Sequence, residues 1–460
     1  MTTTSYFAES ALLPSGWAHQ VLFTVNADGA IAAVTANSQA GGAEKLRGPV
    51  IPGMPNLHSH AFQRAMAGLT EKGGPQGDSF WSWRKLMYGF LENLQPDDIG
   101  IIATQLYIEM LRAGYTAVAE FHYLHHDPQG RPYANPAETG ERIAAAAAAT
   151  GIGLSLLPVF YAHGNFGGVA PNAGQRRFIN SVDGFQRILE SLAATVKKAA
   201  PLQRIGVAPH SLRAVAPEQL KAVVAAMDAL DGQAPIHIHA AEQQKEVDDC
   251  LGWSGTRPVA WLLDNVALGA RWCVVHATHM DANETKALAR SGAVAGLCPT
   301  TEGDLGDGFF NAASYLRATG KIGIGGDSHA AVDPFLELRL FEYGQRLKLE
   351  RRNVLALAIG DSLGGQLYRT ACAGGAQAMG QPVGQLAPGF RADWVVLNDN
   401  DPALAEQHDD GLLDAAIFGP VRAPVRDVMV GGRWQVRDGA HAQGEASLAR
   451  YRAVMKRLLH

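Results

Sequence analysis

The sequence predicts an α/β protein built on a (β/α)8 TIM-like barrel, joined to a small β-sandwich domain that both chain ends build. Eight short apolar runs, separated by segments of helix length, predict the strands of the barrel. Polar side chains of the metal-ligand type follow the first, fifth, sixth and eighth runs. An open, doubly wound sheet fits the same alternation of strands and helices. Closure into a barrel is favoured because a barrel mouth brings those four strand ends around one ion.

The eight apolar runs lie between Val50 and His329, and segments with spaced apolar positions or high helix propensity separate them. The runs are VIPGMPNLHSH, YTAVAEFHY, GIGLSLLPVFY, RIGVAPHSL, APIHIHAAE, RWCVVHATH, GAVAGLCPTTE and KIGIGGDSH. The predicted helices cover residues 97–112, 141–149, 182–199, 217–229 and 282–290.

Both chain ends are rich in strand signals. Residues 21–34 predict a hairpin with an Asp-Gly turn, and residues 392–398 and 426–436 predict further strands. The predicted parts are a small β-sandwich domain of residues 1–50 and 376–445, a barrel of residues 51–375 and a C-terminal helix of residues 446–460.

The composition is that of an ordinary globular protein. Of the 460 residues, 47% are hydrophobic and 18% are charged, and the net charge of −5 provides no broad basic field for nucleic acid or anionic lipid. No run reaches the roughly 18 apolar residues of a membrane-spanning helix. The first residues also lack a basic segment followed by a long apolar run. We therefore expect a cytoplasmic enzyme that acts on a small molecule, with no nucleic-acid or membrane partner.

The first apolar run ends in His58 and His60. The two-residue period of a strand directs both imidazoles to one side, where they can bind one ion. With 16 histidines in 460 residues, chance alone gives about 0.6 His-x-His pairs, so this pair is a weak signal by itself. A second pair of this kind, His237 and His239, occurs in the same chain, so the spacing does not by itself identify a metal site. The order of ligand-type residues after several strands is the stronger signal.

Three more strand ends carry candidates for the same site. His239 ends the fifth run, and Glu242, about one helical turn later, suits a proton carrier. His276 follows the sixth run and is preferred to His279 because it lies nearer the strand end. Asp327 follows the glycines of the eighth run, where the backbone can approach closely. Its carboxylate can bind the ion and accept a proton from water.

Three neutral imidazoles and one carboxylate suit Zn²⁺ and leave room for a water whose pKa falls to about 7. The end of the fourth run, RIGVAPHSLR, contains no lysine that could bridge two ions, so one Zn²⁺ per subunit is predicted. The cysteines are scattered and form no Cys-x-x-Cys motif, which predicts neither a disulfide framework nor a thiolate zinc site. They are Cys250, Cys273, Cys298 and Cys372.

Two arginines indicate a substrate that carries carboxylates. Arg84 and Arg213 follow the first and fourth runs, where planar guanidinium groups can bind carboxylates. Gln63, Tyr123 and His210 also follow barrel strands and can add hydrogen bonds. Each of these five residues, taken singly, also fits a surface or packing role. Their common placement after barrel strands favours substrate binding.

The chain resembles the amidohydrolase superfamily, in its single-metal deaminase branch, over nearly its whole length. The segments that carry this resemblance are PGMPNLHSH, HIHAAE, VVHATH, IGIGGDSH and GQLAPGFRADWVVL. Other segments are similar to the formimidoylglutamate deiminases: HSHAFQRAMAGLTE, FWSWRKLMY, APHSLRAV, CPTTEGDLGDG and GGDSHAAVDPFLELR. Glu302 departs from the wider branch, in which cytosine, guanine and triazine deaminases tend to have Asn. This departure favours the narrower group.

The resemblance implies hydrolysis of N-formimidoyl-L-glutamate to N-formyl-L-glutamate and ammonia, a step of histidine degradation, by a homodimer. It implies metal ligands at His58, His60, His239 and Asp327, catalytic residues at Glu242, His276 and Asp327, and substrate-binding residues at Gln63, Arg84, Tyr123, His210 and Arg213. Two alternatives stay open. One is a single-metal deaminase acting on a nucleobase or cyclic amidine, and the other is a metal-free structural relative. The intact ligand positions argue against the second.

Overall fold

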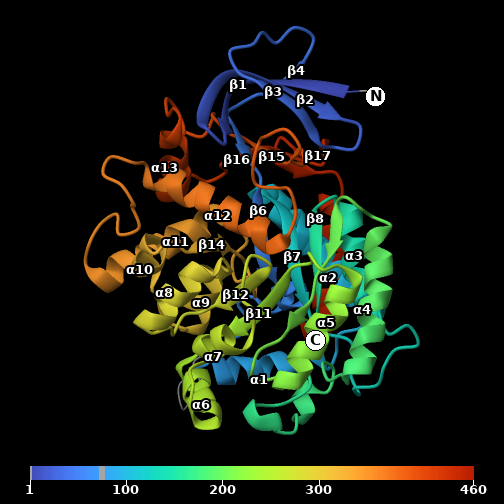
Figure 1. The fold of residues 1–460 in the computed structure, drawn as a ribbon. Coiled ribbons are helices and arrows are strands. Elements are labelled where there is room, and N and C mark those ends of the chain that lie inside the picture. Colours follow the sequence, from blue (N-terminus) through green and yellow to red (C-terminus); the bar gives the residue numbers. More distant parts are fainter. Residues whose placement is uncertain (1–2, 72–77, 460) are drawn as a thin grey trace.

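The computed structural model describes residues 3–71 and 78–459, and it has two parts (Figure 1). A barrel of parallel strands surrounded by helices forms the larger part. A β domain made of strands from both chain ends, blue and red in Figure 1, lies beyond one end of the barrel. The predicted fold class is therefore confirmed.

Eight strand positions form the barrel, in their order along the chain. They belong to two parallel sheets, one from β6 to β10 and one from β11 to β14. One isolated bridge joins Ser211 to His239 of β11. Another joins Ser59, at the end of the first strand, to Asp327, which follows the last strand. These bridges close the barrel, in which β9 and β10 share the fourth position. The strands are β6 Met54–Ser59, β7 Tyr115–His122, β8 Gly153–Phe160, β9 Gln203–Ile205, β10 Ala208–Pro209, β11 Ile236–Ala240, β12 Trp272–His276, β13 Val294–Leu297 and β14 Lys321–Ile324.

The barrel strands are buried on both faces. Every residue of β6, β7, β8, β11, β12 and β13 is buried, as expected when one face lines the barrel and the other packs against helices. The last strand approaches the first very closely, since a Cβ on Gly325 would lie 2.8 Å from the backbone nitrogen of His58. The close approach expected from the glycines of the eighth run is thus present.

Helices follow the barrel strands and cover the outside of the barrel (Figure 1). Their ends follow ordinary sequence signals: α2 begins at Pro96 and ends before Gly114, which has a left-handed conformation. No helix in residues 3–71 or 78–459 is long and apolar enough to cross a membrane. All five predicted helices are present. The helices are α1 Phe80–Leu91, α2 Pro96–Ala113, α3 Glu138–Thr150, α4 Val182–Lys197, α5 Pro217–Leu230, α6 Gln244–Ser254, α7 Pro258–Asn265, α8 Ala282–Ser291, α9 Pro299–Leu305, α10 Ala312–Arg317, α11 Pro334–Leu349, α12 Leu363–Met379, α13 Asp410–Phe418 and α14 Gly444–Leu459.

The β domain is one continuous sheet of nine strands. β5 pairs with β1 from one chain end and with β15 from the other, which links the two sets of strands. The Trp394 ring lies 5.2 Å from Tyr6 and 5.4 Å from Phe23 in a small core of its own. Sequence reasoning found the β2–β3 hairpin but missed β1, and the domain boundaries stay a prediction. The strands are β1 Thr3–Leu13, β2 Gly16–Asn26, β3 Ile31–Thr35, β4 Glu44–Lys45, β5 Val50–Pro52, β15 Trp394–Leu397, β16 Val425–Val430, β17 Arg433–Arg437 and β18 Ala440–His441.

Candidate active site

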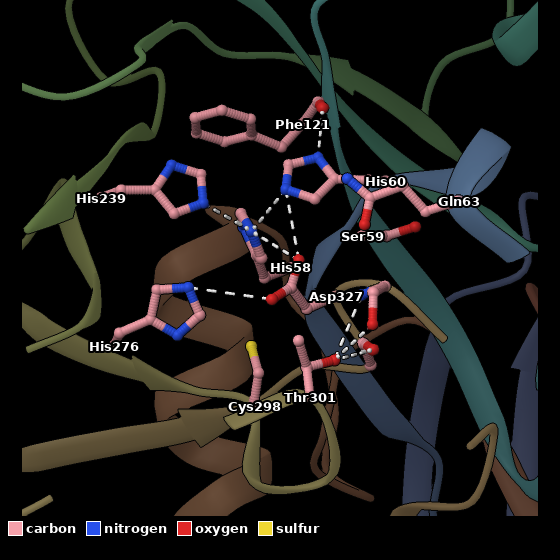
Figure 2. Close-up of polar contacts among 12 residues, drawn as sticks. His58, Ser59, His60, Gln63, Phe121, His239, His276, Cys298, Thr301 and Asp327 are labelled. Carbon is pink, nitrogen blue, oxygen red and sulfur yellow. Dashed lines mark hydrogen bonds and ion pairs between the residues drawn. The ribbon is translucent and has the colours of Figure 1, made fainter. Parts of the chain in front are cut away.

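Three histidines converge at the mouth of the barrel. His58 and His60 come from the end of β6, and His239 comes from β11. The His58 Nε2 atom lies 3.2 Å from His60 Nε2 and 3.1 Å from His239 Nε2 (Figure 2). Asp327 places Oδ1 at 3.2 Å from His60 Nε2 and 3.6 Å from His58 Nε2. The four residues predicted as metal ligands therefore lie together, all of them buried.

The hydrogen bonds of these histidines leave their Nε2 atoms directed at one another, in an arrangement that fits a bound cation. His60 Nδ1 donates to the carbonyl oxygen of Phe121 at 2.9 Å, and His239 Nδ1 faces the carbonyl oxygen of His210 at 3.2 Å. A neutral imidazole has a single N–H, so the Nε2 atoms of both rings present lone pairs. Lone pairs gathered this closely repel one another unless a cation lies between them. The side chains present therefore fit a metal ion.

The electrostatics of the cluster agree with metal binding. Burial lowers the pKa of His60 to about 3 and lowers the pKa values of His58 and His239 well below the usual value. Burial raises the pKa of Asp327 to about 7, although the neighbouring His276 acts in the opposite direction. The histidines are thus in the neutral form that binds metals, and a bound cation would favour the ionised form of Asp327.

Glu120 holds the segment between the first two histidines. Ser59 Oγ donates to Glu120 Oε2 at 2.5 Å, and the Ala61 N–H donates to Oε1 at 2.7 Å. Partners of this kind fix the orientation of ligands around a metal. Sequence reasoning missed Glu120, although a lone carboxylate within the apolar run YTAVAEFHY is a signal that could have been used.

Three strand ends at the site have left-handed backbone conformations in residues other than glycine. The φ angles are 53° at Ala241, 66° at His276 and 48° at Asp327. Such conformations cost of order 1–3 kcal/mol each and persist where the surrounding structure imposes them. The surrounding structure at the site therefore imposes the backbone conformation of the turns after β11, β12 and β14, against the intrinsic preference of these residues.

His276 stands among three carboxylates. Its Nδ1 atom lies 3.2 Å from Glu302 Oε1, and its Nε2 atom lies 3.7 Å from both Glu242 Oε1 and Asp327 Oδ2. Burial acts to lower the pKa of His276, but Glu242, Glu302 and Asp327 outweigh burial and raise it to about 10. A cation on Asp327 would neutralise one of these charges and lower the pKa of His276. The catalytic set predicted from the sequence, Glu242, His276 and Asp327, is thus brought together.

Two other histidines, His279 and His237, make hydrogen bonds to backbone carbonyl groups. His279 Nε2 donates to the carbonyl oxygen of Asp307 at 2.8 Å. His237 Nε2 donates to the carbonyl oxygen of Ala378 at 2.8 Å, so the second His-x-His pair contributes only His239 to the site. The two rings lie on the same side of β11 by the two-residue period, and His239, which the sequence analysis chose, is the one nearer the end of the strand.

A pocket opens beside the histidine cluster, and all five predicted substrate-binding residues line it. Arg84 reaches it from α1, where its guanidinium carbon lies 4.5 Å from the Trp81 ring centre and 5.7 Å from that of Tyr88. Gln63 Nε2 donates to the Tyr123 hydroxyl at 2.8 Å. The lining residues are His60, Gln63, Phe80, Trp83, Arg84, Met87, Tyr88, Tyr123, Tyr161, Phe178, His210, Arg213, His239, Glu242, His276, Thr301, Leu305 and Asp327.

Arg213 is more constrained than the sequence suggested. It is buried, with its guanidinium nitrogens 3.7 Å from Glu242 Oε2 and 3.8 Å from Glu246 Oε2. Glu246 itself accepts hydrogen bonds from the backbone N–H groups of Ala241 and Glu242. The buried arginine therefore lies against the carboxylate of Glu242, the predicted proton carrier, a contact that sequence reasoning did not foresee.

An aromatic wall is the main feature of the pocket that sequence reasoning missed. It comprises Phe80, Trp83 and Tyr88 from α1 together with Tyr161 and Phe178. A signal was present, because the pocket-lining positions of α1 recur at the spacing of one helix face. The segment SFWSWRKLMYGF could therefore have predicted a pocket-facing helix as well as an arginine.

Two family models match the chain. The model of the amidohydrolase family matches residues 50–435, and the model described as "Formimidoylglutamate deiminase HutF, N-terminal domain" matches residues 3–48. The chain is also 55% identical to the formimidoylglutamate deiminase of Pseudomonas aeruginosa, over 98% of this chain and 99% of that relative. The chain therefore belongs to the amidohydrolase family, and within it to the formimidoylglutamate deiminases.

A more distant relative and a solved structure agree. The 8-oxoguanine deaminase of Pseudomonas aeruginosa is 30% identical over 89% of this chain and 87% of its own length. The crystal structure of an amidohydrolase from Brucella melitensis superposes with a TM-score of 0.93 at 48% identity, covering 99% of this chain and 100% of that chain. The fold and the family resemblance predicted from the sequence are both confirmed.

Proposed function

We propose that the protein hydrolyses N-formimidoyl-L-glutamate to N-formyl-L-glutamate and ammonia. The observation that carries this proposal is a single pocket that combines the histidine cluster, the Glu242–His276–Asp327 group and two arginines. The substrate has an amidine at one end and two carboxylates at the other. The pocket offers acidic groups beside the histidines and guanidinium groups to hold carboxylates.

We propose one Zn²⁺ per subunit, held by His58, His60, His239 and Asp327. Three imidazole nitrogens and a carboxylate form a donor set that suits zinc better than magnesium or calcium. A bound zinc ion would lower the pKa of a water toward about 7 and so supply the nucleophile near neutral pH.

The proton transfers fall to Glu242, His276 and Asp327. His276 Nε2 and Asp327 Oδ2 lie on the same side and accept the proton of the attacking water. As the formimidoyl carbon becomes tetrahedral, Glu242 donates a proton to the imine nitrogen, and the proton taken from water replaces it on Glu242. When the new C=O bond forms, the hydroxyl proton passes to the same nitrogen, the C–N bond breaks and ammonia leaves. Arg213 supports this step because it keeps the Glu242 carboxylate directed at His276.

The remaining polar residues orient the substrate. Gln63 donates to the Tyr123 hydroxyl, and that hydroxyl donates to the Met87 sulfur at 3.6 Å, a weak acceptor that a substrate carboxylate can replace. The Oε1 atom of Gln63 is buried and has no partner among the described residues, so it can accept a hydrogen bond from a substrate N–H. Arg84 and Arg213 provide the charges for the two carboxylates, and His210 adds a further hydrogen-bonding group.

The aromatic wall supports one alternative, a deaminase that acts on a nucleobase or cyclic amidine. Trp83, Tyr88, Tyr161 and Phe178 could stack against a planar ring, and a relative at 30% identity is an 8-oxoguanine deaminase. Two pocket arginines have no evident use for such a ring. The acidic amidine substrate is therefore the better fit.

Incubation of zinc-loaded protein with N-formimidoyl-L-glutamate tests the proposal, provided that both products are identified. Ammonia with N-formylglutamate is the expected result. Formamide with glutamate would mean that the other C–N bond is cut and that the proton scheme is wrong. No turnover by a metal-replete sample, followed by turnover of 8-oxoguanine or another cyclic amidine, would replace this substrate with the alternative.

The homodimer and the cytoplasmic location stay predictions. We propose both on the family resemblance, and light scattering coupled to gel filtration would measure the oligomeric state.

A further inference from the structure

A second group of ligand-type side chains lies beside the first. The ligand atoms of His276, Cys298 and Asp327 all lie within 4.8 Å of one another, and all three residues are buried. Cys298 follows β13, and Figure 2 shows its sulfur directed toward the space between His276 and Asp327. The proposed reaction gives the Cys298 thiol no role.

Asp327 presents a different oxygen to each group. Its Oδ1 atom lies 3.2 Å from His60 Nε2, whereas its Oδ2 atom lies 3.7 Å from His276 Nε2. Two ions about 3.5–4 Å apart are the usual spacing in two-metal sites, and one carboxylate can bridge them at that spacing. An ion held by the three histidines would use Oδ1 and leave Oδ2 for a second ion.

His276 is held in the orientation that a metal ligand needs. Its Nδ1 atom faces Glu302 Oε1 at 3.2 Å, and the same oxygen accepts the backbone N–H of Cys298 at 2.9 Å. Histidine ligands of metals usually donate their other N–H to a carboxylate in this way. The Nε2 atom is buried and has no hydrogen-bond partner among residues 3–71 and 78–459. It is therefore directed at the space that Cys298 and Asp327 also face.

We propose that His276, Cys298 and Asp327 form a second, inhibitory metal site for thiophilic divalent cations such as Cd²⁺ or Zn²⁺ in excess. One sulfur, one nitrogen and one oxygen favour these ions over Mg²⁺ and Ca²⁺, which prefer oxygen ligands alone. Binding displaces the thiol proton of Cys298 to solvent, and no redox change is needed.

An ion at this second site blocks the proton transfers and leaves the first ion in place. It takes the Nε2 lone pair of His276 and the Oδ2 atom of Asp327, which the proposed reaction uses to accept a proton. The inhibition rests on the proposed function, but the binding of the second ion does not. Direct measurement of bound metal therefore separates a failure of one from a failure of the other.

The test titrates Cd²⁺ into the full chain already loaded with one equivalent of Zn²⁺. Bound zinc and cadmium are measured by elemental analysis after equilibrium dialysis, and the sulfur-to-cadmium charge-transfer absorption is followed in the ultraviolet. We expect one further equivalent of Cd²⁺ without loss of zinc, a thiolate absorption band, and a fall in turnover of about tenfold or more as that band saturates. A protein that binds no further equivalent, or binds one without the band, overturns the proposal.

Two variants locate the sulfur ligand. In Cys298→Ala we expect basal activity within about twofold of the parent, no thiolate band, and a half-inhibitory Cd²⁺ concentration about a hundredfold higher. The matched control is Cys273→Ala, which removes another buried thiol, on β12, and should behave as the parent does. If Cys298→Ala fails to fold, Cys298→Ser is measured instead. A band that survives loss of Cys298, or disappears with loss of Cys273, contradicts the proposal.

Discussion

The two ends of the pocket are built on different parts of the fold. At the histidine end, the side chains extend from barrel strands, are buried, and are fixed by partners such as the Phe121 carbonyl oxygen and Glu120. At the other end, Arg84 comes from α1 and lies against aromatic rings at 4.5–5.9 Å. Among the described residues, Arg84 makes no ion pair.

This difference assigns separate tasks to the two ends. Strand ends joined by backbone bridges hold the proposed reacting groups in position before a substrate arrives, and such positioning favours catalysis. Arg84 on this helix face lies near aromatic rings and pairs with no carboxylate among the described residues, so its charge is available to a substrate carboxylate. We therefore expect changes at the histidine end to affect kcat and metal binding, and changes at the α1 end to affect mainly KM.

Metal removal should have the largest effect. Dialysis against a chelator should reduce turnover of N-formimidoyl-L-glutamate to background, because the histidine cluster then has no cation to activate water. Added zinc should restore turnover, since the ligands are held by the barrel itself. Circular dichroism before and after chelation checks that the fold survives, and unchanged turnover in metal-free protein would contradict the site.

Glu242→Gln should reduce kcat by about a thousandfold with little change in KM, because it removes a proton carrier and keeps the size of the side chain. The same variant should retain its zinc, since Glu242 is not among the proposed ligands. Elemental analysis alongside steady-state kinetics separates the two effects. A kcat within a few fold of the parent would remove Glu242 from the proton-transfer scheme.

Glu120→Gln should weaken zinc binding by about 10–100-fold, because the amide cannot accept hydrogen bonds from both Ser59 and Ala61. Competition with a chromogenic chelator measures the affinity. Glu342→Gln is the matched control: Glu342 is also buried and accepts the N–H groups of Val354 and Leu355. It should lower the melting temperature and leave zinc affinity unchanged.

Zinc affinity should fall by about tenfold per pH unit below pH 7. Asp327, whose pKa burial raises to about 7, then carries a proton that competes with the metal. His60, with a pKa lowered to about 3, does not compete in this range. Isothermal titration in buffers of different ionisation heats would count the protons released. A much steeper loss between pH 7 and pH 5 would mean that the histidine ligands also titrate there.

Arg84→Ala should have the smallest effect, raising KM by about tenfold with kcat nearly unchanged. The reason is that Arg84 binds a substrate carboxylate equally well in the ground state and in the transition state. Lys245→Ala is its control. Lys245 lies 5.8 Å from the same Trp81 ring but pairs with Asp249, so its removal should leave KM unaltered. If kcat fell with Arg84→Ala instead, the proposed division between the two ends of the pocket would be wrong.

Much of the fold was predictable, because eight apolar strand runs, most of them ending in polar residues, recur between Val50 and His329. The metal ligands were predicted from the same recurrence of strands, because the end of a strand fixes the direction of the side chain that follows it. Glu120 and Glu302 were harder to assign because each acts through another residue, and such contacts depend on neighbouring strands. The strand β1 was missed although its partner strands β2, β4 and β5 all lie near the same end of the chain.

The bridge between Ser59 and Asp327 has a consequence for biosynthesis. The first two proposed ligands, His58 and His60, leave the ribosome early, whereas the proposed carboxylate ligand Asp327 is synthesised more than half a chain later. A nascent barrel therefore cannot hold its ion firmly until the eighth strand has closed against the first. Metal acquisition should be a late event of maturation, and cells starved of metal should accumulate a folded protein that awaits loading.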